Sequence, residues 1–138
     1  MAVIAIAGLP GSGKTVLIKD LVQHGYSSFD DINTDWCGRL PRARTEARTG
    51  RDLVVSDIMF CDESWRKRLE TELGIAVQWI FFENNPWQCA KNSLFRFMFE
   101  KPDRPLQNEI RKIQELSRIY KPHGDIRPVA DAGASYTN

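Results

Sequence analysis

The sequence of 138 residues has little material for a metal site or a disulfide framework. Its three cysteines and two histidines lie far apart in the chain, which excludes the usual zinc-ligand and disulfide spacings. No apolar run approaches the ~20 residues that span a bilayer, and the first residues lack the basic start of a secretory signal. The net charge is only +1, so the chain as a whole is not typical of proteins that bind duplex nucleic acid. We therefore expect a cytoplasmic protein with no membrane partner.

The composition is that of an ordinary globular domain, with 42% hydrophobic and 27% charged residues. The length also fits one domain, and we expect residues 1–138 to form a single unit. The residues after 131 are small and polar, which predicts a loose C-terminal tail.

Five short apolar segments alternate with segments of helical periodicity. The apolar segments are Ala2–Ala7, Tyr26–Phe29, Leu53–Asp57, Ile75–Phe82 and Ile126–Val129. Helices are expected after Gly13, from Asp35, after Asp62, after Pro86 and from Leu106 to Tyr120. Strands that alternate with helices form βαβ units, so the sequence predicts an α/β fold with a mostly parallel central sheet of about five strands and helices on both faces. The apolar face expected to pack in the helix after Pro86 carries Trp87, Ala90, Leu94 and Phe97.

The segment Gly8–Thr15 matches the phosphate-binding pattern G-x-x-x-x-G-K-[ST] at every required position. It follows an expected buried strand and opens an expected helix, so backbone amides and the helix N-terminus face the same anion. Lys14 has the reach to contact the β- and γ-phosphates of ATP, and the Thr15 hydroxyl is a ligand for Mg²⁺. A strand-to-helix turn that binds nothing is the alternative. The residues expected to bind the nucleotide are Gly8, Pro10, Gly11, Ser12, Gly13, Lys14, Thr15 and Val16.

Carboxylates follow the second and third apolar segments, where open α/β sheets build their sites. Transfer of a phosphoryl group to a hydroxyl needs one carboxylate for the acceptor proton and another on the side of the metal. We assign Asp35 to the first role and Asp57 to the second. As alternatives, Asp35 and Asp57 cap helical turns, and Asp30 and Asp31 are solvated turn residues.

Four segments together resemble the kinase domain of phage-type polynucleotide kinases, with zeta-toxin-like proteins and other small P-loop kinases as wider relatives. They are Gly8–Thr15, Ile32–Asp35, Val55–Asp57 and Ala90–Asn92. The resemblance implies a three-layer P-loop NTPase fold in which Asp35 is the base that activates the acceptor hydroxyl. It also implies a lid at about residues 95–105, with Lys91 or Arg96 near the ATP phosphates, and a loop beside Arg127 that borders the nucleobase.

Five arginines and one glutamate lie between Arg39 and Arg51, where such a kinase holds its acceptor. Arginine forks suit bidentate phosphate contacts, so we expect Arg39 and Arg42 to bind a phosphorylated acceptor. A solvated surface helix or loop is the alternative.

These observations favour an ATP-dependent phosphotransferase that uses Mg²⁺ and phosphorylates a hydroxyl of a nucleotide, a nucleic-acid end or a small metabolite. Two alternatives remain open: an NTPase, and a nucleotide-binding regulator without phosphotransfer. The second alternative is retained because Thr34, Ile58 and Met59 depart from the family pattern.

Overall fold

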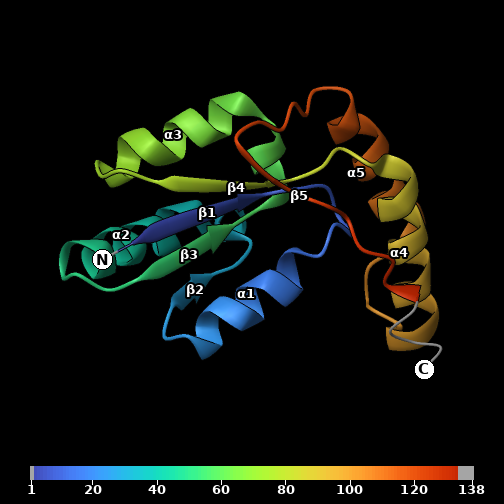
Figure 1. Cartoon of the computed structure of the whole chain (residues 1–138), viewed down its shortest axis with the longest axis horizontal. Coiled ribbons are helices and arrows are strands. Elements are labelled where there is room, and N and C mark those ends of the chain that lie inside the picture. The colour runs from blue at the N-terminus through green and yellow to red at the C-terminus, as the bar shows by residue number, and fades with distance from the viewer. Residues whose placement is uncertain (1, 134–138) are drawn as a thin grey trace.

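Residues 2–133, which the computed structural model describes, form a five-stranded sheet flanked by helices (Figure 1). The strands are β1 (Val3–Ala7), β2 (Ser27–Phe29), β3 (Leu53–Ser56), β4 (Gln78–Phe82) and β5 (Asp125–Arg127). The helices are α1 (Lys14–Gln23), α2 (Trp36–Arg48), α3 (Glu63–Leu73), α4 (Pro86–Glu100) and α5 (Leu106–Ser117). Two short 3₁₀ helices, η1 (Ile32–Asp35) and η2 (Ile58–Cys61), follow β2 and β3.

The strand order is β2-β3-β1-β4-β5, and every neighbouring pair is parallel. The central strand β1 is buried along its whole length, as expected for a strand covered on both faces. Because all strands run the same way, their carboxyl ends meet at one edge of the sheet, which we call the carboxyl edge. The parallel α/β fold expected from the sequence is confirmed.

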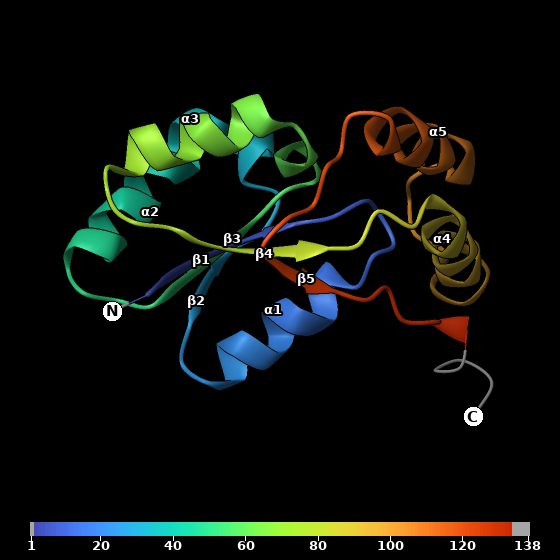
Figure 2. The same cartoon turned by 45° about the horizontal axis from the view of Figure 1, so that its top comes forward.

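Helices α2 and α3 cover one face of the sheet, and α1 covers the other (Figure 2). Helices α4 and α5 pack on each other and stand beside the carboxyl edge, with residues 101–105 as the loop between them. None of the helices in residues 2–133 is long and apolar enough to cross a membrane.

The expected packing face of α4 is wrong at three of its four residues, since only Ala90 packs against the core. Trp87 is 77% exposed, Leu94 is 44% exposed and Phe97 is 39% exposed. The buried residues of this helix are Cys89, Asn92 and Ser93. The reason is that α4 packs its small and polar side against other backbone segments, so its hydrophobic periodicity does not mark the buried face.

Several expected boundaries also shift. The helix from Asp35 is longer than expected and takes in most of the arginine-rich segment, up to Arg48. The fourth strand starts at Gln78, and the last strand ends at Arg127. In the tail expected to be loose, the backbone amide of Ala132 donates to Asn92, and residues 134–138 lie outside the described part of the chain.

Candidate active site

The loop between β1 and α1 has the backbone shape of a phosphate cradle. Gly11 and Gly13 have φ values of +82° and +106°, in the left-handed region that favours glycine. Gly13 is the N-cap of α1 and supplies no side-chain cap, so the first amides of that helix are free for an anion. Beyond them, Thr15 and Val16 are exposed on the first turn of α1, whereas Pro10 is buried in the loop.

Lys14 is folded back over this loop. Its Nζ donates to the carbonyl oxygens of Gly8 and Leu9, both at 2.8 Å, and lies 3.4 Å from the Ser12 hydroxyl. Burial lowers the pKa of Lys14, while the nearby thiols and the carboxylates of Asp30 and Asp31 oppose that shift. The ammonium group is thus held by neutral carbonyls at a place where a phosphate would supply the missing negative charge.

Helix α4 supports the same loop from behind. A Cβ at Gly11 would lie 2.5 Å from the carbonyl oxygen of Cys89 and 2.8 Å from the Ser93 hydroxyl, so only glycine fits. The buried Asn92 amide donates to the carbonyl oxygens of Gly11, at 2.9 Å, and Ala130, at 2.8 Å. The cradle is therefore fixed to α4 and to the segment after β5.

Three of the four carboxylates near the carboxyl edge take part in local hydrogen bonds. Asp57 is buried and accepts the backbone amides of Met59 (2.8 Å) and Asn33 (2.9 Å). Asp30 accepts the Ser56 hydroxyl at 2.6 Å. Asp35 caps α2 by accepting the amide of Gly38 at 3.3 Å. The capping alternatives considered for Asp35 and Asp57 are thus present in the fold.

Asp31 differs from these three, because no hydrogen bond to its carboxylate occurs among the described residues. It is exposed, and its backbone has φ of +53°, which is uncommon for a residue other than glycine. Desolvation raises its pKa, helped by the carboxylates of Asp30 and Asp57 and opposed by Arg104 and Lys14. Asp31 therefore lies within electrostatic reach of the cradle lysine.

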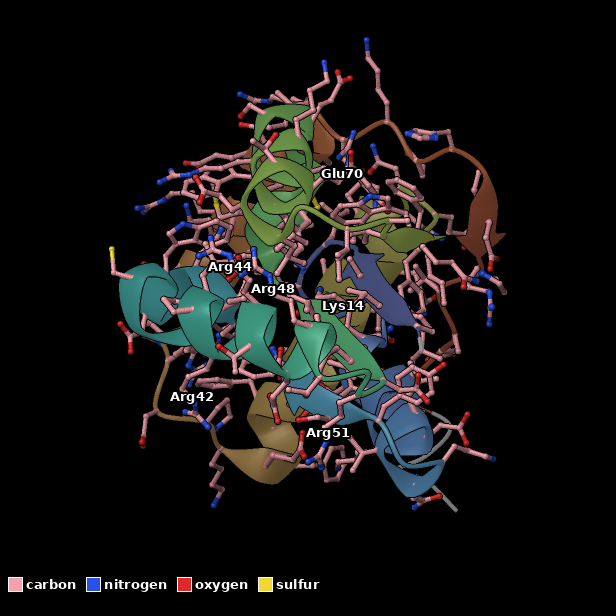
Figure 3. All side chains as sticks on the ribbon, turned by 90° about the vertical axis from the view of Figure 1, so that its left-hand side faces the viewer. Lys14, Arg42, Arg44, Arg48, Arg51 and Glu70 are labelled. Atoms are coloured by element: carbon pink, nitrogen blue, oxygen red, sulfur yellow. The ribbon has the colours of Figure 1, made fainter. Side chains whose placement is uncertain are left out.

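The arginines of the segment from Arg39 to Arg51 have different partners in the structure. Arg39, in the first turn of α2, donates to the carbonyl oxygen of Asp30, and the Arg42 guanidinium lies 5.9 Å from the centre of the Phe29 ring, over the end of β2. Arg44 pairs with Glu72, and Arg51 with Glu46. Figure 3, viewed from the amino ends of the strands, shows that the labelled arginines spread around α2 and do not face one way. At 1.5 Å per residue, the end of α2 is about 20 Å from Asp35, so Arg39 is the member of the segment nearest the site.

The expected lid comprises the last turns of α4 and the loop to α5. Arg96 forms an ion pair with Glu109 of α5, whose side chain is only 9% exposed, so this arginine joins the two helices. Arg104, in the loop, is the lid residue within electrostatic reach of Asp31. At the edge of the sheet, Arg127 is exposed on β5 and pairs with Asp125 through contacts of 2.8 and 3.0 Å, beside Phe82 of β4.

The site offers few protein oxygens to a metal ion. This suits Mg²⁺, if most of its ligands are phosphates and waters. Among residues 2–133 no group of three or more His, Cys, Asp or Glu side chains could hold a metal ion by itself. Mg²⁺ does not require such a group, because it keeps several waters and takes one or two protein oxygens beside substrate phosphates. The Thr15 hydroxyl on α1 and the Asp57 carboxylate at the end of β3 are oxygens of this kind.

Comparison with solved structures supports the fold. A gluconokinase from Sinorhizobium meliloti 1021 superposes with a TM-score of 0.65 and 16% sequence identity, over 97% of this chain and 86% of that one. The chain has the three-layer fold of small P-loop kinases. No family model matches the sequence, and no curated protein matches it. The resemblance to P-loop kinases is thus supported by the fold, and the narrower resemblance to polynucleotide kinases stays a hypothesis.

Sequence reasoning underrated three residues. Asp31 and Arg104 gave no motif signal and come together only through the fold. Both polar atoms of the Asn33 side chain are buried without a hydrogen-bond partner among the described residues, although Asn33 belongs to the segment that carries the family resemblance. Its position two residues before Asp35 was the one available signal.

Proposed function

We propose that the protein is an ATP-dependent phosphotransferase that moves the γ-phosphoryl group of ATP to a hydroxyl of a small or nucleic-acid-derived acceptor. The observation that carries this proposal is the position of Lys14, which is held in the phosphate cradle within electrostatic reach of Asp30 and Asp31. A cation among phosphate-binding amides, next to carboxylates that can face a hydroxyl, is the arrangement that phosphoryl transfer requires.

On the nucleotide side, the segment Gly8–Val16 binds the phosphates through its free backbone amides, chiefly those at the start of α1, and Lys14 contacts the β- and γ-phosphates. The exposed Arg127, beside the carboxyl end of β4, borders the nucleobase. Thr15 and Asp57 hold Mg²⁺, which neutralises phosphate charge when it is bound. Arg96 approaches the γ-phosphate from the lid, which requires that it leave Glu109.

On the acceptor side, Arg39 and Arg42 bind an anionic group of the acceptor. The acceptor oxygen forms a bond to the γ-phosphorus, the bond from that phosphorus to the β–γ bridging oxygen breaks, and ADP leaves with the electron pair. The hydroxyl proton passes to a carboxylate after β2, for which the sequence favours Asp35. Candidate acceptors are nucleotides, 5′-hydroxyl ends of oligonucleotides and, because the similar structure is a gluconokinase, sugar acids.

Incubation with γ-labelled ATP, Mg²⁺ and a panel of these acceptors tests the proposal. We expect label in one class of acceptor, and loss of that transfer in Lys14→Ala. Label found only in inorganic phosphate would indicate an NTPase, and nucleotide binding without turnover would indicate a regulator. Either result contradicts the proposal.

A further inference from the structure

In the segment after β2, Asp31 lies between two residues, Asp30 and Asn33, that are held in place by hydrogen bonds. On one side, Asp30 is fixed twice, since its side chain accepts the Ser56 hydroxyl and its carbonyl oxygen accepts the Arg39 guanidinium. On the other side, the amide of Asn33 donates to the buried carboxylate of Asp57 at 2.9 Å. Asp31 lies between these attachments with φ of +53° and ψ of +44°. Left-handed backbone at a residue other than glycine persists where its surroundings fix it, and such residues gather at functional sites.

The carboxylate of Asp31 is the least engaged of the four after β2 and β3. The carboxylates of Asp30, Asp35 and Asp57 each accept at least one hydrogen bond from the protein. Asp31 accepts none among the described residues, and it is exposed. A base needs a free oxygen within reach of the proton that it removes. Among the described residues both oxygens of Asp31 are free of hydrogen bonds, whereas Asp30 and Asp35 each accept at Oδ1 and Asp57 accepts at both oxygens.

Two cations near Asp31 come from different parts of the proposed site. Arg104, in the loop between α4 and α5, and Lys14, in the phosphate cradle, both interact electrostatically with Asp31, each less strongly than the carboxylates of Asp30 and Asp57. Asp35 instead lies at the start of α2, where a Cβ at Gly38 would approach its Oδ2 to 2.5 Å. The hydrogen bond from the Gly38 amide to Asp35 is that of a helix N-cap, in which the side chain accepts an amide of the first turn.

We infer that Asp31 is the catalytic residue that contacts the acceptor hydroxyl and takes its proton, and that Asp35 is the cap that positions α2 and Arg39. This inference rests on the proposed function and changes the residue to which the proton goes. The proton of the hydroxyl moves to the Asp31 carboxylate as the acceptor oxygen bonds to the γ-phosphorus and ADP departs.

Two asparagine variants separate the two carboxylates. Asparagine adopts left-handed backbone readily, so Asp31→Asn is expected to fold. Asparagine also caps helices as well as aspartate does, so Asp35→Asn keeps the cap while it removes the carboxylate. Asp20→Asn, at an exposed position of α1, is the control and is expected to keep the parent kcat. The readouts are kcat, the KM for the acceptor and the Kd for ATP, each with the acceptor found in the panel.

We expect Asp31→Asn to lower kcat at least ~100-fold with the Kd for ATP within about threefold of the parent value, and Asp35→Asn to keep kcat within about threefold. A ~100-fold loss in Asp35→Asn, alone or together with Asp31→Asn, overturns the inference while phosphotransfer by the parent still supports the proposed function. If Asp31→Asn transfers phosphate at the parent rate, the inference is likewise overturned, and the proposed function still stands. If the parent itself transfers no label to any acceptor, the proposed function fails, and the inference fails with it.

Discussion

The side-chain amide of Asn92 in α4 donates to the carbonyl oxygen of Gly11 in the phosphate cradle at 2.9 Å, across 81 positions of the sequence. The same side chain donates to Ala130 and accepts from Gln88 and from the amide of Ala132. One buried residue therefore joins the loop that follows β1, helix α4 and the segment that follows β5. The shape of the cradle depends on this junction as well as on its glycines.

Asn92→Ala is expected to weaken both the fold and the nucleotide site. The substitution leaves the carbonyl oxygens of Gly11 and Ala130 without this donor, which lowers the free energy of unfolding by about 2–3 kcal/mol. Because the cradle is then less ordered, the Kd for ATP rises as well. Urea denaturation and ATP titration measure the two effects. Trp87→Ala, at an exposed position of the same helix, is the control, and an Asn92→Ala variant as stable as that control would show that the junction is not needed.

Asp31→Asn is expected to stabilise the protein at neutral pH. The folded-state pKa of Asp31 is raised above the ordinary value of 3.8, so the folded protein binds this proton more tightly than the unfolded chain does. The parent therefore loses stability, relative to the variant, as pH rises from 3.8 through the folded-state pKa. Because the side chain is exposed, water screens the effect, and we expect a Tm rise of about 1–2 °C at pH 7. The difference should vanish below about pH 3; a variant with a lower Tm than the parent at pH 7 contradicts this electrostatic account.

The three cysteines are expected to differ sharply in reactivity. Burial, as the main cause, raises the pKa of Cys61 to about 12 and that of Cys89 to about 11, whereas Cys37 is exposed. Only the thiolate reacts, and a thiol with a pKa of about 12 is roughly one part in ten thousand ionised at pH 8. Iodoacetamide followed by mass spectrometry should therefore modify Cys37 in the native protein and all three residues in urea. Rapid native labelling of Cys61 or Cys89 would mean that these side chains are not packed beside the cradle.

The sheet and the cradle could be predicted from the sequence because their signals are local. Apolar runs such as Val3–Ala7 mark buried strands, and the motif at Gly8–Thr15 encodes its own turn and helix start. The buried face of α4 could not be predicted, because Asn92 and Ser93 are polar and are buried by backbone partners far away in the chain. That Asp31 accepts no hydrogen bond among the described residues, while its neighbours do, also depends on contacts made in the fold, and no sequence spacing reports them.

Calorimetric titration of the protein with ATP and Mg²⁺ tests the central claim, that this loop binds a nucleoside triphosphate. The parent should bind one ATP per chain, and Lys14→Ala should weaken binding about 10- to 100-fold, the loss expected for a hydrogen bond between charged groups. Lys19→Ala, on the exposed side of α1, should bind like the parent. No heat of binding in the parent, or saturation that is unchanged in Lys14→Ala, would contradict the claim.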